Sequence, residues 1–116
     1  MADSRYRETR PKPARSPLEK TIQANIIRYL RGQGAVVDNN VGTAFGQAGR
    51  LDLTVCWEGR YITIEVKRPG EQPTLLQRRE IERVKAAGGV AIVAYSVGDV
   101  AALLECLARN NEGEAK

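Results

Sequence analysis

Residues 51 to 67 constrain the fold more than any other part of the chain, because they form two strand-like runs around a tight turn. Residues 51–57 and 60–67 are rich in β-branched and aromatic residues, and they flank Glu58 and Gly59. A two-residue hairpin loop needs positive φ angles, which glycine adopts without steric cost. The pattern therefore predicts a β-hairpin with Glu58-Gly59 as its turn.

The turn sets the register of this hairpin. If the loop has two residues, Trp57 lies opposite Arg60, and counting back places Asp52 opposite Glu65. Because side chains alternate along a strand, Asp52, Glu65 and Lys67 then share one face. The other face is expected to be core and to consist of Leu51, Leu53, Val55, Ile62, Ile64 and Val66.

Two opposed carboxylates with Cβ atoms about 4.5–5.5 Å apart repel each other and should destabilise the sheet. A cation between Asp52 and Glu65 would remove this cost. Mg²⁺ is the simple candidate, since one or two carboxylates together with water and substrate phosphate commonly hold it. The alternative is a solvated polar face of an edge hairpin, in which Lys67 forms an ordinary ion pair.

The amino-acid composition excludes several catalytic mechanisms and metal sites. The 116 residues contain no histidine and two cysteines, Cys56 and Cys106, which are far apart in the sequence. Zinc sites of the usual spacing and histidine-dependent hydrolysis are therefore excluded, and both cysteines are expected to be reduced thiols, with Cys106 in the core. Carboxylates and a metal remain as the means of hydrolysis. The formal charge of +4 favours a polyanionic partner, although it also serves solubility.

The remaining segments predict one α/β domain. Residues 1–15 carry five basic and two acidic residues and form an expected disordered basic arm. Helices are predicted over residues 16–31, 75–87 and 97–108, and further strands over residues 35–41 and 90–95, the latter buried on both faces. The domain would span residues 16–108, and residues 109–116 would form a flexible tail.

The glycine-rich loop over residues 42–50 lacks the Gly-Lys-Ser/Thr of a nucleotide-binding loop, so no nucleotide cofactor is expected. Its backbone amides could approach a phosphate, with Gly49 and Arg50 next to Asp52. A plain connecting loop is an equal alternative for its other residues.

These residues also carry a family resemblance. Gly49-Arg50-Leu51-Asp52 followed by Glu65-Val66-Lys67 resembles the D…(E/D)xK signature of the PD-(D/E)xK nuclease superfamily. Within it the sequence is most similar to the VRR-NUC nucleases, and it resembles archaeal Holliday-junction resolvases more distantly. The likeness covers residues 16 to about 105. Leu51 replaces the leading proline of the signature.

The resemblance implies a restriction-endonuclease-like αβββαβα core, a central mixed sheet flanked by helices. It also implies that Glu19 joins a metal site formed by Asp52, Glu65 and the backbone carbonyl of Val66, with Gln23 one turn after Glu19. Lys67 and Gln77 would complete the catalytic set. Glu19 could instead only complete the cap of its helix after Ser16, and Gln77 could only make a local hydrogen bond.

The expected function is a Mg²⁺- or Mn²⁺-dependent DNA endonuclease. The resemblance implies a homodimer that cleaves branched DNA such as four-way junctions, in the cytoplasm of a bacterium or a phage-infected host cell. The alternatives are a flap or single-strand nuclease and a non-catalytic DNA-binding module. No apolar run is long enough to span a membrane. The expected DNA-contacting residues are Gly49, Arg50, Arg68, Arg78 and Arg79.

Overall fold

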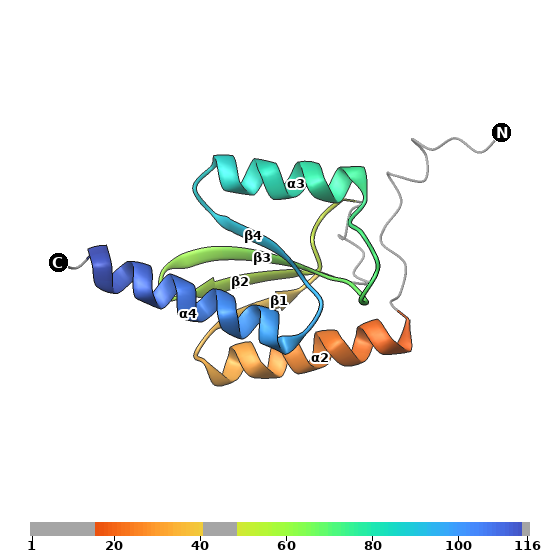
Figure 1. Cartoon of the computed structure of the whole chain (residues 1–116), viewed down its shortest axis with the longest axis horizontal. Coiled ribbons are helices and arrows are strands. Elements are labelled where there is room, and N and C mark those ends of the chain that lie inside the picture. Colours follow the sequence, from red (N-terminus) through yellow and green to blue (C-terminus); the bar gives the residue numbers. More distant parts are fainter. Residues whose placement is uncertain (1–15, 41–48, 115–116) are drawn as a thin grey trace.

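The structure is a computed structural model that describes residues 16–40 and 49–114 (Figure 1). The expected order of elements is confirmed. Along the chain the elements are α2 (Pro17–Gly32), β1 (Val36–Asn39), β2 (Leu53–Trp57), β3 (Arg60–Val66), α3 (Leu75–Ala86), β4 (Val90–Ala94) and α4 (Val97–Glu114).

The four strands form one mixed sheet in the order β1-β2-β3-β4. The pairs β1–β2 and β2–β3 are antiparallel, whereas β3 and β4 are parallel and are joined through α3. A parallel pair needs such a crossover, because the chain must return to the starting end of the sheet.

Helices cover both faces of the sheet, as expected for the restriction-endonuclease-like core. Figure 1 shows α3 on one face and α2 and α4 together on the other. The larger core lies between the sheet and the α2–α4 layer. It includes Ile26, Leu30, Leu53, Val55, Ile62, Ile64, Val66, Val100 and Leu104.

The predicted hairpin is confirmed. Trp57 pairs with Arg60, Val55 with Ile62, and Leu53 with Ile64. Glu58 and Gly59 have φ angles of 48° and 76°, the two positive values that a type I′ turn requires.

Two predictions about the hairpin and its neighbour strand are wrong. Leu51 does not lie on the same face as Leu53, because β2 begins only at Leu53 and the bend before it breaks the alternation. Leu51 instead packs against Val84, Ala91 and Ile81 on the α3 side. The strand β4 is not buried throughout, since it lies at an edge of the sheet and three of its residues, Val90, Ile92 and Val93, are only half-buried.

The last helix also differs from expectation. It continues past Ala108 to Glu114, so the boundary expected at residue 109 is not the end of the helix. Cys106 is exposed rather than in the core, because it lies beside the apolar stripe that contains Leu104 and Leu107. Both cysteines are free thiols, as predicted.

The basic arm over residues 1–15 and most of the glycine-rich loop, residues 41–48, lie outside the described residues. Of that loop region, Gly49 and Arg50 are described. Among the described helices, none combines the length and apolar character that crossing a bilayer would require.

Candidate active site

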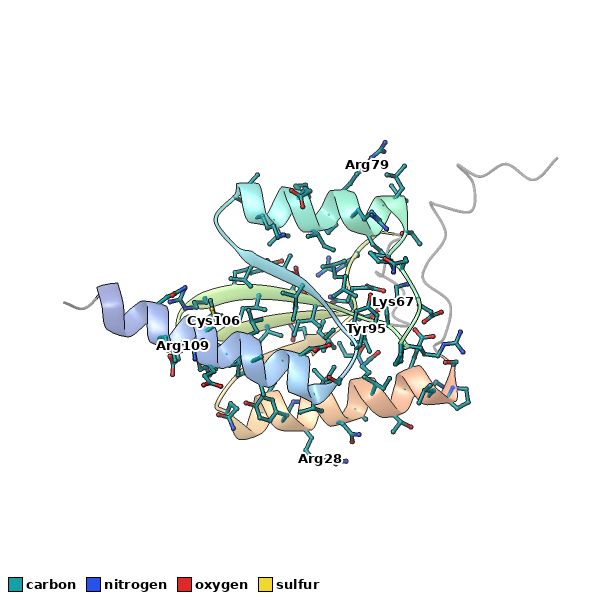
Figure 2. The ribbon with its side chains drawn as sticks, viewed as in Figure 1. Arg28, Lys67, Arg79, Tyr95, Cys106 and Arg109 are labelled. Carbon is teal, nitrogen blue, oxygen red and sulfur yellow. The ribbon has the colours of Figure 1, made fainter. Side chains whose placement is uncertain are left out.

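Asp52, Glu65 and Lys67 lie at the end of the sheet where α2 and α3 begin. Figure 2 shows Lys67 at this end. Asp52 immediately precedes β2, Glu65 lies in β3, and Lys67 follows β3. The β2–β3 pairing ends at Leu53 and Ile64, and Asp52 lies in the bend just before it, where its side chain reaches the backbone of Val66, next to Glu65.

The acidic side chains at this end are buried. Asp52 and Glu65 are 0% exposed, Glu19 is 6% exposed, and Lys67 is 8% exposed. Burying a charge away from water is costly unless an opposite charge or hydrogen bonds stabilise it. Among the buried residues that the structure describes, three carboxylates accompany one ammonium group. Added positive charge would therefore stabilise this end of the sheet.

Asp52 is fixed by the backbone of the neighbouring strand. Its Oδ2 accepts a hydrogen bond from the backbone N–H of Val66 at 2.9 Å. Asn40, which sequence reasoning missed, holds the same segment. Its backbone N–H donates to the carbonyl of Asp52, and its Nδ2 donates to Leu51 O at 3.0 Å and Thr54 Oγ1 at 2.9 Å. In the sequence, only the position of Asn40, a polar residue near the end of the strand predicted over residues 35–41, indicated that it could hold this segment.

Glu65 is held from two sides. Its Oε2 accepts a hydrogen bond from Gln77 Nε2 at 2.8 Å and lies 3.6 Å from Lys67 Nζ. Lys67 lies next to Glu65 because the two residues are close together along the chain at the end of β3. Gln77 contacts Glu65 from α3, which covers that face of the sheet.

The orientation of Gln77 follows from the start of α3. Thr74 is the N-cap, and its hydroxyl accepts a hydrogen bond from the backbone N–H of Gln77, while Gln77 Oε1 accepts one from the backbone N–H of Thr74 at 2.8 Å. This reciprocal capping box fixes the amide, because its oxygen must face an N–H donor. Its NH₂ group then points at Glu65. Gln77 therefore makes both the local hydrogen bond at the start of α3 and the contact with Glu65.

Glu19 lies on the buried face of α2, in the first turn after the N-cap Ser16. Its backbone N–H donates to Ser16 Oγ, and its Oε1 accepts from the same hydroxyl at 3.2 Å. Its Oε1 also lies 3.8 Å from Arg68 Nε. Gln23, one turn later, is buried, and its Oε1 has no hydrogen-bond partner among the described residues.

Arg68 connects this helix with the segment after β3. Its Nη2 forms an ion pair with Glu71 Oε2 at 3.1 Å, and its backbone N–H donates to Glu71 Oε1. These hydrogen bonds lower the pKa of Glu71, and the same carboxylate raises the pKa of Arg68. Arg68 is half exposed, so one face of its side chain is open to a ligand.

The other expected DNA contacts separate into two groups. Gly49, Arg50 and Arg79 line one hollow on the α3 side, and Figure 2 shows Arg79 extending from the outer side of α3. Arg78 donates to the carbonyl of Pro73 at 3.3 Å and does not line that hollow. Gly49 has a φ of +91°, and a Cβ there would lie 2.9 Å from Leu76 Cβ. Only glycine lets the chain lie so close to α3 before it enters β2.

The donor set fits a hard divalent cation. Within residues 16–40 and 49–110, no three Asp, Glu, Cys or His side chains are gathered closely enough to form a ligand set. The acidic set is instead a pair of fully buried carboxylates, Asp52 and Glu65, with oxygen donors only. Mg²⁺ needs no more than one or two carboxylates when water and substrate phosphate supply the other positions.

The layered mixed sheet and the acidic pair with its lysine define a domain of the restriction-endonuclease-like class. Within this class the chain has the fold of a VRR-NUC nuclease domain. A solved structure described as a VRR_NUC domain matches it with a TM-score of 0.66 and 27% sequence identity, over 78% of this chain and 97% of that chain. No family model and no curated protein matches the sequence.

Proposed function

We propose that this nuclease domain is a Mg²⁺- or Mn²⁺-dependent endonuclease that hydrolyses phosphodiester bonds in DNA. One observation carries the proposal: two fully buried carboxylates, Asp52 just before β2 and Glu65 in β3, with Lys67 3.6 Å from Glu65. A structural hairpin gains nothing from burying two like charges at one end, whereas a hydrolase needs such a cluster to bind a cation beside a phosphate.

Asp52, Glu65 and the backbone carbonyl of Val66 would hold the cation, whereas Glu19 is not close enough to both carboxylates to be a third ligand and would act from outside this set. A bound divalent cation supplies Lewis-acid polarisation of the phosphate and a lowered pKa for water. The protein must then orient the attacking water and stabilise charge on the phosphate. Lys67 could orient the water and stabilise the charge on the phosphate, because its ammonium group lies 3.6 Å from Glu65, which would bind the cation.

Gln77 would act as a positioning residue. Its amide donates to Glu65 and is itself fixed by the cap of α3. A carboxylate held in one rotamer presents its other oxygen in a constant direction, which is the preorganisation that catalysis requires.

For the substrate we propose branched DNA, and for the assembly a homodimer, since a symmetric pair of sites suits a substrate with two-fold symmetry. The expected place of action is the cytoplasm. The test compares cleavage of labelled four-way junction, flap and linear duplex substrates with and without Mn²⁺. Light scattering of the purified protein measures whether two chains associate.

Lys67→Ala separates a nuclease from a pure binding module. We expect cleavage to fall by about 10²–10³-fold while DNA binding persists. Lys85→Ala is the matched control, because Lys85 is an exposed lysine on α3 that pairs only loosely with Glu82, at 3.9 Å. Equal cleavage by both variants, or cleavage without any divalent cation, would refute the proposed site.

Asp52→Asn tests the cation site without DNA. Asparagine can still accept the hydrogen bond from Val66 N–H through its carbonyl oxygen, so the backbone contact is kept while the charge is lost. We expect Mn²⁺ to raise the melting temperature of the unaltered protein and not that of Asp52→Asn. A cation-induced shift of the same size in both would place the cation elsewhere.

A further inference from the structure

A groove between α3 and the hairpin lies outside the acidic cluster. Its first part is a hollow of about 300 Å³, lined by residues that include Arg50, Leu51 and Thr54 on the sheet side and Leu76 and Arg83 on the helix side. Arg50 and Leu51 come directly before Asp52, so the hollow begins next to the candidate active site.

The groove continues toward the turn of the hairpin. A second hollow, of about 570 Å³, is lined by residues that include Gly59, Arg60 and Gly89. Both hollows share Tyr61 and Arg83. The two therefore form one path that starts beside Asp52 and follows the hairpin to its turn.

The charges along this path are mostly positive. Arg50, Arg79 and Arg83 line the first hollow, whereas the Arg60 guanidinium faces the opposite side of the sheet, where its Nη2 donates to the carbonyl of Leu107 in α4 (Figure 1). Glu80 is the acidic residue of the first hollow, and it is engaged by Arg83 through two hydrogen bonds of 2.9 Å. A groove with several guanidinium groups favours a chain of phosphates over a neutral ligand.

Tyr61 gives the groove an aromatic surface. It lies in β3 and is 52% exposed, although most large apolar side chains of the sheet are buried. Gly89 lies against it, since a Cβ at residue 89 would be 3.2 Å from Tyr61 Cδ1. One side of the ring is thus packed against Gly89 and the other is exposed, with Arg83 beside it in the lining of both hollows.

Tyr61 and Glu65 lie on the same face of β3, four residues apart, which corresponds to about 13 Å along the strand. An exposed aromatic ring in a basic groove is the usual platform for single-stranded nucleic acid, because bases stack on the ring and arginines contact the backbone. Base pairs of a duplex are already stacked on each other and cannot offer their faces to Tyr61.

We propose that this groove holds an unpaired DNA segment next to the cleaved bond, with one base stacked on Tyr61 and adjacent phosphates contacted by Arg50 and Arg83. The proposal rests on the proposed nuclease function and specifies its substrate. Branched DNA with unpaired bases at the branch point would therefore fit this groove better than a continuous duplex.

The test measures stacking without cleavage. The full-length protein is titrated, in EDTA, into a short oligothymidine that carries one central 2-aminopurine, whose fluorescence falls when the base stacks on an aromatic ring. We expect quenching by the unaltered protein and by Tyr61→Phe, which keeps the ring. Tyr61→Ala should lose the quenching and bind about tenfold more weakly.

Charge is tested by the salt dependence of the same binding. Arg83→Ala should lower the slope of log Kd against log salt by about 1, as loss of one phosphate contact predicts. Arg28→Ala is the matched control, because Arg28 extends from α2 on the other side of the sheet and bonds only weakly to Asn25, at 3.5 Å (Figure 2). Its slope should not change.

Three results would overturn the proposal: no quenching by the unaltered protein, equal quenching by Tyr61→Ala, or tighter binding of the same oligonucleotide when it is annealed to its complement. Circular dichroism spectra show whether Tyr61→Ala is folded, and Tyr61→Phe provides the test if it is not. Because the assay contains no divalent cation, its result does not depend on nuclease activity. Absent cleavage with normal quenching would refute the nuclease alone.

Discussion

Gln77 donates a 2.8 Å hydrogen bond from its Nε2 to Glu65 Oε2, while its Oε1 accepts one of the same length from the backbone N–H of Thr74. A single amide thereby caps α3 and holds a carboxylate of the candidate active site. The position of the helix and the orientation of the acid are linked through one side chain.

Gln77→Glu separates these two roles. Glutamate can still accept from Thr74 N–H, as in an ordinary capping box, but it places a second carboxylate against Glu65. We expect stability without divalent cations to fall by about 1–3 kcal/mol, partly recovered on addition of Mg²⁺, together with a loss of cleavage. Urea unfolding with and without Mg²⁺ measures the first effect.

Thr74→Ala is the control for that experiment. It removes the N-cap, at a cost of about 1 kcal/mol, and leaves Gln77 next to Glu65. Equal losses of cleavage in Thr74→Ala and Gln77→Glu would mean that Gln77 acts only through the helix.

Gly49→Ala tests the close approach of the chain to α3. The added Cβ would meet Leu76 Cβ at 2.9 Å and the Leu76 carbonyl oxygen at 3.4 Å, in a residue with φ of +91°. We expect a loss of stability of about 2–4 kcal/mol, since strain in φ and the contact both contribute. Gly70→Ala has the same φ cost, with φ of +92° and no heavy atom within 4 Å. Unfolding free energies of the two variants should differ by the contact alone, and equal values would contradict the model of a tight approach.

Glu58→Asn should stabilise the hairpin. Glu58 has a φ of 48°, which asparagine adopts more readily than glutamate. We expect a gain of about 0.5–1 kcal/mol in unfolding free energy, whereas Glu58→Val should destabilise the protein because β-branched residues resist positive φ. Thermal unfolding of both variants measures whether the melting temperature rises or falls. A shift in the same direction for both would argue against a positive φ at residue 58.

The ion pair between Arg68 and Glu71 gives a dependence on pH. The hydrogen bond from Arg68 lowers the pKa of Glu71 in the folded protein. Its stabilising contribution is therefore complete above the unfolded pKa of about 4.3 and is lost as the pH falls through the lower, folded value. We expect Glu71→Gln to be less stable than the unaltered protein at neutral pH and the difference to shrink in acid. A difference that grows below pH 4 would be inconsistent with this pairing.

Local patterns were enough to predict the hairpin. Its turn and the register from Trp57–Arg60 to Leu53–Ile64 depend on residues close in sequence. Leu51 was assigned to the wrong face because alternation was extended past the start of β2, where a bend interrupts it. Cys106 was misplaced although its helical position, to the side of Leu104 and Leu107, already argued against burial.

Contacts between distant elements were not accessible from those patterns. The bond from Gln77 to Glu65 depends on how α3 lies over β3, and only the family resemblance drew attention to Gln77. The groove beside Tyr61 depends on the spacing between α3 and the sheet, which no local period encodes. Asn40 was missed for the same reason, because its two side-chain partners lie 11 and 14 residues away.

The parallel pairing of β3 with β4 through α3 bears on how the protein matures. Asp52, Glu65 and Lys67 lie within one contiguous stretch around the hairpin, which emerges from the ribosome before α3 and β4 do. Pairing across a crossover is slower than closing a hairpin, because more chain entropy is lost before the contact forms. The nascent chain therefore carries its acidic pair before Gln77 can orient Glu65. On the proposed function, the site would be complete only once the C-terminal part of the chain has docked.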